Sequence, residues 1–237
     1  MIDLERQYVC KKCGYNMIGQ YFQFCPFCGA SNANFITAEE CSQKYKIVSS
    51  RVNDNIIRLS SYPPLGLEHS AYSIEIDNKI IWIDCPSTFN KDLKPMDKIL
   101  FTHHHFLGAS NLYRGYYTAF IWIHKNDSEH SLSELYPFDK TFTQNFKISG
   151  IEAYHIDGHS SGFTTYFFEN VLFICDYIIQ TDQSFILNPY GSLKSTMEGA
   201  KKLNKLIGKR EFDTVCGFNY VMDYQIWKRE FLKLLKI

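Results

Sequence analysis

Residues 101–111, FTHHHFLGASN, place three consecutive histidines directly after a short apolar run that reads as a strand. Residues i and i+2 of an extended chain point to the same side, so His103 and His105 share one side and His104 faces the other. Two imidazoles on one side, each about 2.0–2.1 Å from a common ion, are a standard start for a zinc site. We therefore expect His103 and His105 to be metal ligands, and His104 to lie outside the site.

Two later segments supply further candidate ligands. YHIDGHSSG holds His155 and His159 around a glycine turn, and LFICDY places Asp176 at the end of another strand. If these strand ends meet at one edge, His103 and His105, a histidine of this turn and Asp176 would form a metal site with an open position. His155 is expected to be a packed neighbour and not a ligand.

The remaining histidines and the four scattered cysteines are not expected to bind metal. We expect His69 to lie at the surface, and His124 and His130 to be solvated. Isolated cysteines in a chain with no sign of secretion most often pack as small buried hydrophobes. This expectation covers Cys41, Cys85, Cys175 and Cys216.

The other four cysteines form two C-x2-C-G turns, VCKKCGY and FCPFCGA, with eleven residues between Cys13 and Cys25. Two such turns facing each other place four thiolate sulfurs in a tetrahedron that suits zinc or iron. The glycine after each pair lets the backbone turn tightly, so that N–H groups point at sulfur. The expected ligands are Cys10, Cys13, Cys25 and Cys28.

Residues 8–35 resemble the rubredoxin-like domain found at one end of rubrerythrins. Such domains hold one iron and pass single electrons, whereas zinc ribbons share the CPxCG turn and serve as structural or interaction modules. Zinc and iron therefore both stay open for the four-cysteine site. Residues 36–45 are polar and are expected to form a short helix or linker, which gives a module over residues 1–45 and a main domain over residues 46–237.

Composition limits the classes of function. The 237 residues carry 25 basic and 25 acidic side chains, so no overall basic field favours nucleic acid or an anionic membrane. No apolar run reaches the roughly 18 residues of a membrane span, and the first residues lack an apolar secretory segment. We expect a cytoplasmic chain that acts on a small-molecule substrate, with no membrane or nucleic-acid partner; a homodimer stays open.

The main domain alternates strand-like and helix-like segments. Runs at 56–62, 71–77, 79–85, 98–104, 147–156, 164–170, 171–179 and 212–218 are rich in β-branched and aromatic residues. The pairs Asp77–Asn78 and Glu169–Asn170 read as hairpin turns. Helices are expected over 108–117, 192–209 and 223–236. Strand pairs followed by helices favour a layered α+β domain over an all-β barrel.

From residue 55 onward the motifs resemble the metallo-β-lactamase fold superfamily, an αββα sandwich. KIIWIDCPS looks like the early strand that ends in a structural aspartate, here Asp84. FTHHHFLGAS matches the main H-x-H motif, DGHSSG the later histidine turn, and FICDYI the strand with the bridging aspartate. The resemblance implies His103, His105 and His159 as ligands of one metal, with Asp176 beside it.

The chain departs from the family at the second metal site. Leu107 stands where the motif has aspartate, Gly108 where it has the next histidine, and Phe218 or Asn219 where the final histidine would fall. The resemblance therefore implies a single zinc in the histidine site, held by three histidines with Asp176.

One zinc with three histidines and a water lowers the pKa of that water toward 7, which supports hydrolysis of an ester, thioester or amide. Asp176 would be the catalytic residue, orienting the water or accepting its proton. Two alternatives stay open. One is a non-catalytic binding or sensor module whose fold is stabilised by metal. The other is a rubredoxin-linked redox protein related to flavodiiron proteins.

Overall fold

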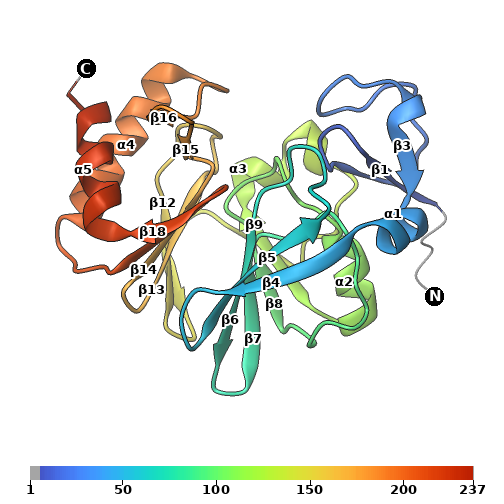
Figure 1. Ribbon diagram of the computed structural model, residues 1–237, viewed down its shortest axis with the longest axis horizontal. Coiled ribbons are helices and arrows are strands. Elements are labelled where there is room, and N and C mark those ends of the chain that lie inside the picture. The colour runs from blue at the N-terminus through green and yellow to red at the C-terminus, as the bar shows by residue number, and fades with distance from the viewer. Residues whose placement is uncertain (1–5, 237) are drawn as a thin grey trace. The chain divides into compact units, whose positions relative to one another are not determined.

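Residues 6–236 are described by a computed structural model, in which the chain divides into two compact units. Unit 1 comprises Met1–Ile123 and Ser128–Thr141, and unit 2 comprises His124–Asp127 and Phe142–Ile237. Each unit combines β-sheet with helices, which confirms the expected α+β class (Figure 1). Within the described residues, no helix has the length and apolar character needed to cross a membrane. The boundary expected after residue 45 stays a prediction.

Unit 1 begins with a small antiparallel sheet in the order β2-β1-β3. A short helix follows it, and Thr37 and Glu40 form a reciprocal capping box at its start. The helix expected within residues 36–45 is thereby confirmed. The elements are β1 (Gln7–Cys10), β2 (Asn16–Ile18), η1 (Asn32–Asn34), β3 (Phe35–Thr37) and α1 (Ala38–Lys44).

The main sheet of unit 1 has seven strands in the order β10-β9-β8-β7-β6-β5-β4. The first four along the chain pair antiparallel, and β8 then joins β7 and β9 in parallel. The strands are β4 (Lys46–Arg51), β5 (Ile56–Tyr62), β6 (Ala71–Ile76), β7 (Lys79–Ile83), β8 (Lys98–Leu100), β9 (Phe120–His124) and β10 (Lys140–Phe142). Helix α2 (Ser110–Tyr117) and the short elements α3 (Lys125–Ser128) and η2 (Ser131–Ser133) follow in the connections.

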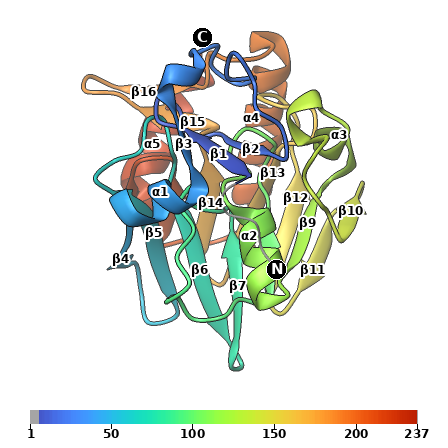
Figure 2. The same cartoon turned by 90° about the vertical axis from the view of Figure 1, so that its right-hand side faces the viewer.

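Helix α2 covers one face of this sheet (Figure 2). Its buried Tyr113 meets Trp82 of β7 edge to face, with ring centroids 4.9 Å apart. Residues of the N-terminal sheet, among them Val9, Cys10 and Cys13, belong to the same hydrophobic core. Residues of the four-cysteine segment are therefore part of the core that stabilises the seven-stranded sheet.

Unit 2 has a six-stranded sheet in the order β11-β12-β13-β14-β17-β18, in which only the β14–β17 pair is parallel. Helices α4 and α5 pack on one face of this sheet and bury Leu203, Trp227 and Phe231 (Figure 1). The elements are β11 (Phe146–Ile148), β12 (Ile151–His155), β13 (Thr164–Phe168), β14 (Val171–Cys175), β15 (Ile178–Gln180), β16 (Phe185–Leu187), α4 (Leu193–Ile207), β17 (Thr214–Gly217), β18 (Val221–Asp223) and α5 (Tyr224–Leu234).

The expected turns and helices are confirmed, with one difference beside the histidines. Asp77 and Asn78 both have positive φ between β6 and β7, as a two-residue hairpin turn requires, and Glu169 has positive φ between β13 and β14. The strand expected over 98–104 ends earlier, at Leu100. His103 and His105 therefore lie in an irregular loop, and the alternation of an extended chain does not explain their orientation.

Candidate metal centres

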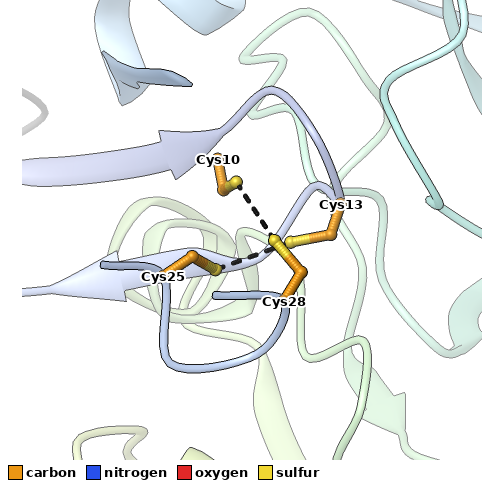
Figure 3. Close-up of side chains that lie close together, drawn as sticks. All are labelled: Cys10, Cys13, Cys25 and Cys28. Atoms are coloured by element: carbon orange, nitrogen blue, oxygen red, sulfur yellow. Dashed lines mark hydrogen bonds between the residues drawn. The ribbon is translucent and has the colours of Figure 1, made fainter. Parts of the chain in front are cut away.

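The four paired cysteines lie together in unit 1 (Figure 3). The Sγ atoms of Cys10 and Cys28 are 3.7 Å apart, and those of Cys13 and Cys25 are 3.6 Å apart. Zinc–sulfur bonds of about 2.3 Å in a tetrahedron require sulfur atoms roughly 3.8 Å apart. The spacing therefore fits a tetrahedral four-thiolate site, and no disulfide competes for these cysteines.

Backbone geometry and charge both suit this cluster to a metal. Each turn is closed by the amide of the glycine that follows it, and the Tyr15 amide donates to the Cys13 sulfur at 3.5 Å. Hydrogen bonds with Cys13 and Cys25 lower the pKa of Cys10 below its ordinary value, because the neighbouring thiols donate to its sulfur. This arrangement favours the thiolate, which is the form that binds metals.

The histidine pair of unit 1 also comes together. The ring centroids of His103 and His105 are 4.7 Å apart, and the two side chains offer ring nitrogens within 4.8 Å of each other. His103 is buried and His105 is half-buried. His104 stacks on His130 with ring centroids 3.8 Å apart and also meets the His105 ring edge to face at 4.4 Å, but it is not part of the group whose atoms could share a metal.

A hydrogen-bond relay defines which nitrogen of His103 carries a proton. The Thr102 hydroxyl lies 2.9 and 3.0 Å from the two carboxylate oxygens of Asp84, and 3.0 Å from Nδ1 of His103. An ionised carboxylate only accepts, so the hydroxyl gives its proton to Asp84 and accepts one from His103 Nδ1. This tautomer places the lone pair of His103 on Nε2, the arrangement of a metal-ligating histidine.

Unit 2 holds the other two candidate ligands close together. Nε2 of His159 lies 3.4 Å from Oδ2 of Asp176, and both side chains are buried. Nδ1 of His159 is 2.6 Å from the carbonyl oxygen of Tyr190, which only accepts, so Nδ1 carries the proton. Burial opposes protonation of His159, but the nearby Asp176 carboxylate raises the pKa of the imidazole above its ordinary value.

Asn188 fixes this second pair. Its amide nitrogen donates to the backbone oxygen of Asp176 at 2.9 Å and to Oδ2 of Asp176 at 3.2 Å. It also lies 3.4 Å from Nε2 of His159. A hydrogen-bond partner of this kind orients a carboxylate that binds metal. Its loss commonly weakens metal affinity by roughly 10- to 100-fold.

The structure corrects two expectations about the other histidines. His69, expected at the surface, is buried, and its ring packs on Phe106 with centroids 4.2 Å apart. His124, expected to be solvated, is buried and stacks on His155 with centroids 4.1 Å apart. His130 is exposed as expected, and His155 is the packed neighbour that the sequence indicated. The four scattered cysteines are all buried.

No family model matches the chain, and no curated protein matches its sequence. Solved structures do match. A metallo-β-lactamase from Pontibacter korlensis aligns with a TM-score of 0.66 at 15% identity, covering 81% of this chain and 99% of its own. A metallo-β-lactamase from Hirschia baltica gives 0.64 at 14% identity over 78% and 96%. The protein TTHA1623, solved in a di-iron-bound form, gives 0.56 at 17% identity over 69% and 94%.

This chain has the metallo-β-lactamase fold. The similarity spans nearly the whole of each of these structures, and the resemblance drawn from the sequence motifs is confirmed at the level of fold. The match to the Pontibacter protein leaves about a fifth of this chain uncovered. The expected four-cysteine cluster near the N-terminus is also present.

Two residues of unit 1 stand where the family motif named from the sequence has aspartate and histidine. Leu107 is fully buried in the hydrophobic core. Gly108 has a φ of +54°, and a Cβ added there would lie 2.4 Å from the carbonyl oxygens of Cys85 and Pro86. The backbone at position 108 therefore leaves no room for any side chain, including the histidine of the family motif.

The third altered position lies in unit 2. Phe218 is half-buried, and Asn219 is exposed, with its amide donating to the Gln180 carbonyl at 3.3 Å. Neither side chain matches the histidine that the family motif places there.

Sequence reasoning missed the residues that orient the candidate ligands. Thr102 adjoins the histidine triplet, and its contact with Asp84 joins two strand ends that only the fold brings together. Asn188 stands twelve residues after Asp176 in a segment without a recognisable motif. Asp127, buried beside the histidine turn of unit 2, accepts from the Ser160 hydroxyl at 2.9 Å. Such contacts are visible only in three dimensions.

Proposed function

We propose that His103, His105 and His159 hold one metal ion with the Asp176 carboxylate beside it, and that the chain is a metal-dependent hydrolase of an ester, thioester or amide. The observation that carries this proposal is the hydrogen-bond contact at Nδ1 of both His103 and His159. Nδ1 of His103 lies 3.0 Å from the Thr102 hydroxyl and Nδ1 of His159 lies 2.6 Å from the Tyr190 carbonyl, which leaves Nε2 of each ring for a metal. The metallo-β-lactamase fold and the order of the motifs along the chain support the same set of ligands.

The chemistry of this donor set fits zinc, which accepts imidazole and carboxylate ligands. When bound, a zinc ion with three histidine ligands supplies a water whose pKa is about 7. In this proposal Asp176 is the catalytic residue, which would orient that water and take up its proton. Asn188 holds the Asp176 carboxylate in place through Oδ2, and Tyr190 fixes the ring of His159.

The four-cysteine site has a separate role in the proposal, because four thiolates leave no open position for a substrate. Its donor set suits zinc or iron equally, and we propose that it is structural. The redox alternative related to flavodiiron proteins needs a second metal in the large domain. Buried Leu107 and the crowded backbone at Gly108 argue against that second metal. The alternative of a binding module is left to the test.

The test uses zinc-loaded full-length chain and a panel of chromogenic esters, thioesters and amides. We expect hydrolysis that a chelator abolishes and zinc restores. Asp176→Asn should lower the rate about 100-fold or more, within the range of lost general-base catalysis. Asp182→Asn, an exposed change in the same unit, should leave it unchanged. Absence of zinc-dependent hydrolysis across the panel would favour the binding module, and equal rates for the two variants would remove Asp176 from the chemistry.

A further inference from the structure

The second cysteine turn reaches the histidine pair of unit 1 through one side chain. Phe27 lies between Cys25 and Cys28, and its ring meets the His105 ring edge to face with centroids 5.6 Å apart. It also contacts Phe106, the residue after His105, at 5.5 Å. A single aromatic ring therefore separates two ligands of the four-cysteine site from a proposed ligand of the histidine site.

The two cysteine turns are anchored to unit 1 in different ways. Cys10 and Cys13 of the first turn are fully buried in the core, and the neighbouring Tyr15 hydroxyl donates to the Leu132 carbonyl at 2.7 Å. These contacts hold the first turn in unit 1 without a metal. Cys10 and Cys13 are therefore the two ligands of the four-cysteine site whose position does not depend on metal binding.

The backbone hydrogen bonds of the second turn are local, although Cys25 is buried in the same core and the Phe27 ring stacks on Tyr15 with centroids 6.3 Å apart. These hydrogen bonds run within residues 23–32, from Cys25 to Ala30, from Gly29 to Cys25 and from Asn32 to Gln23. Cys28 is exposed, and Phe24 is 55% exposed. A metal that joins the sulfurs of both turns would tie this segment more tightly to the fixed first turn, and would add to the Tyr15 contact that positions the Phe27 ring.

We propose that Phe27 is a positioning residue that couples the two metal sites: metal on the four cysteines presses Phe27 against His105 and thereby raises the affinity of the histidine site. The inference rests on the proposed histidine site. Coupling of this kind is reciprocal, so metal at the histidine site raises the affinity of the cysteine site by the same factor. The four-cysteine segment then acts as a support for the histidine site.

The size of the expected change in zinc affinity follows from the Phe27–His105 contact. An edge-to-face aromatic pair adds a small stabilisation beyond the area it buries, and its loss corresponds to roughly a three- to tenfold change in affinity. Phe27→Ala should weaken zinc at the histidine site by that factor while leaving the four-cysteine site loaded. Phe27→Tyr keeps the ring and should restore the wild-type affinity. Phe24→Ala, an exposed aromatic of the same turn, is the matched control and should change nothing.

The experiment titrates the zinc-loaded full-length chain with a chromogenic chelator and reads one dissociation constant for each site. Cobalt in place of zinc reports loading of the cysteine site through its thiolate absorption band. His105→Ala should weaken the cysteine site by the factor that Phe27→Ala imposes on the histidine site. If the wild type binds two zincs and the affinities of Phe27→Ala equal those of Phe24→Ala, the coupling is wrong but the histidine site stands. If the wild type binds only one zinc, both the histidine site and the coupling are wrong.

Discussion

The backbone around Gly108 leaves no room for the histidine that the family motif has at this position, and substitution of this glycine tests that steric argument. An L-residue at a φ of +54° loses about 1–2 kcal/mol to backbone strain. A Cβ 2.4 Å from two carbonyl oxygens adds an overpacking cost of about 1–3 kcal/mol, because backbone atoms cannot move aside as a side chain can. Gly108→Ala should therefore destabilise the chain by about 2–5 kcal/mol.

Gly19→Ala is the matched control, since Gly19 has a φ of +66° and nothing within 4 Å of its added Cβ. It bears the backbone strain alone, about 1–2 kcal/mol. Thermal unfolding followed by circular dichroism should place the Tm of Gly108→Ala about 2–12 °C below that of Gly19→Ala, since each kcal/mol moves the Tm by about 2–4 °C in a chain of this size. Equal Tm values would refute the steric reasoning, and an extra metal bound by Gly108→His would refute the single-metal site.

Three further outcomes are expected. Replacing Cys10 and Cys13 together by serine should remove one metal per chain. It should also lower the Tm, because both residues lie in the core shared with the seven-stranded sheet. Metal analysis and thermal unfolding check this, and an unchanged Tm would contradict it. Asn188→Ala should weaken zinc at the histidine site roughly 10- to 100-fold in a chelator competition, whereas exposed Gln183→Ala should not. Burial lowers the pKa of His124 below its ordinary 6.5, so the stability it contributes is present above pH 6.5 and is lost as the pH falls through its folded-state pKa. His124→Gln should flatten the fall in Tm between about pH 6.5 and 5.

The sequence was sufficient for the features that depend on local spacing. The two C-x2-C-G turns predicted the four-cysteine cluster, because two short loops of fixed geometry define where four sulfurs stand. The pair Asp77–Asn78 predicted its hairpin, since both residues tolerate positive φ. The order of the histidine and aspartate motifs indicated the metallo-β-lactamase fold, which the structural comparison confirmed.

The features that depend on packing were beyond the reach of a single sequence. His69 and His124 carry no local signal that distinguishes a buried imidazole from a solvated one, and both were assigned to the wrong environment. The strand before the histidines ends at Leu100, so the reason for placing His103 and His105 on one side was wrong although their rings do lie close together. The Phe27–His105 contact joins residues 78 positions apart and exists only because the cysteine segment packs into unit 1.

The most direct test of the central claim is the metal content of the purified full-length chain, resolved by element and counted per protein. We expect two ions in the wild type, one on the four cysteines and one on the histidine site. Replacing His103 and His105 together by alanine should leave one ion, with the thiolate absorption of the cobalt-substituted cysteine site unchanged. A count that stays the same after this double replacement would contradict the assignment of the histidine site and the hydrolase proposal with it.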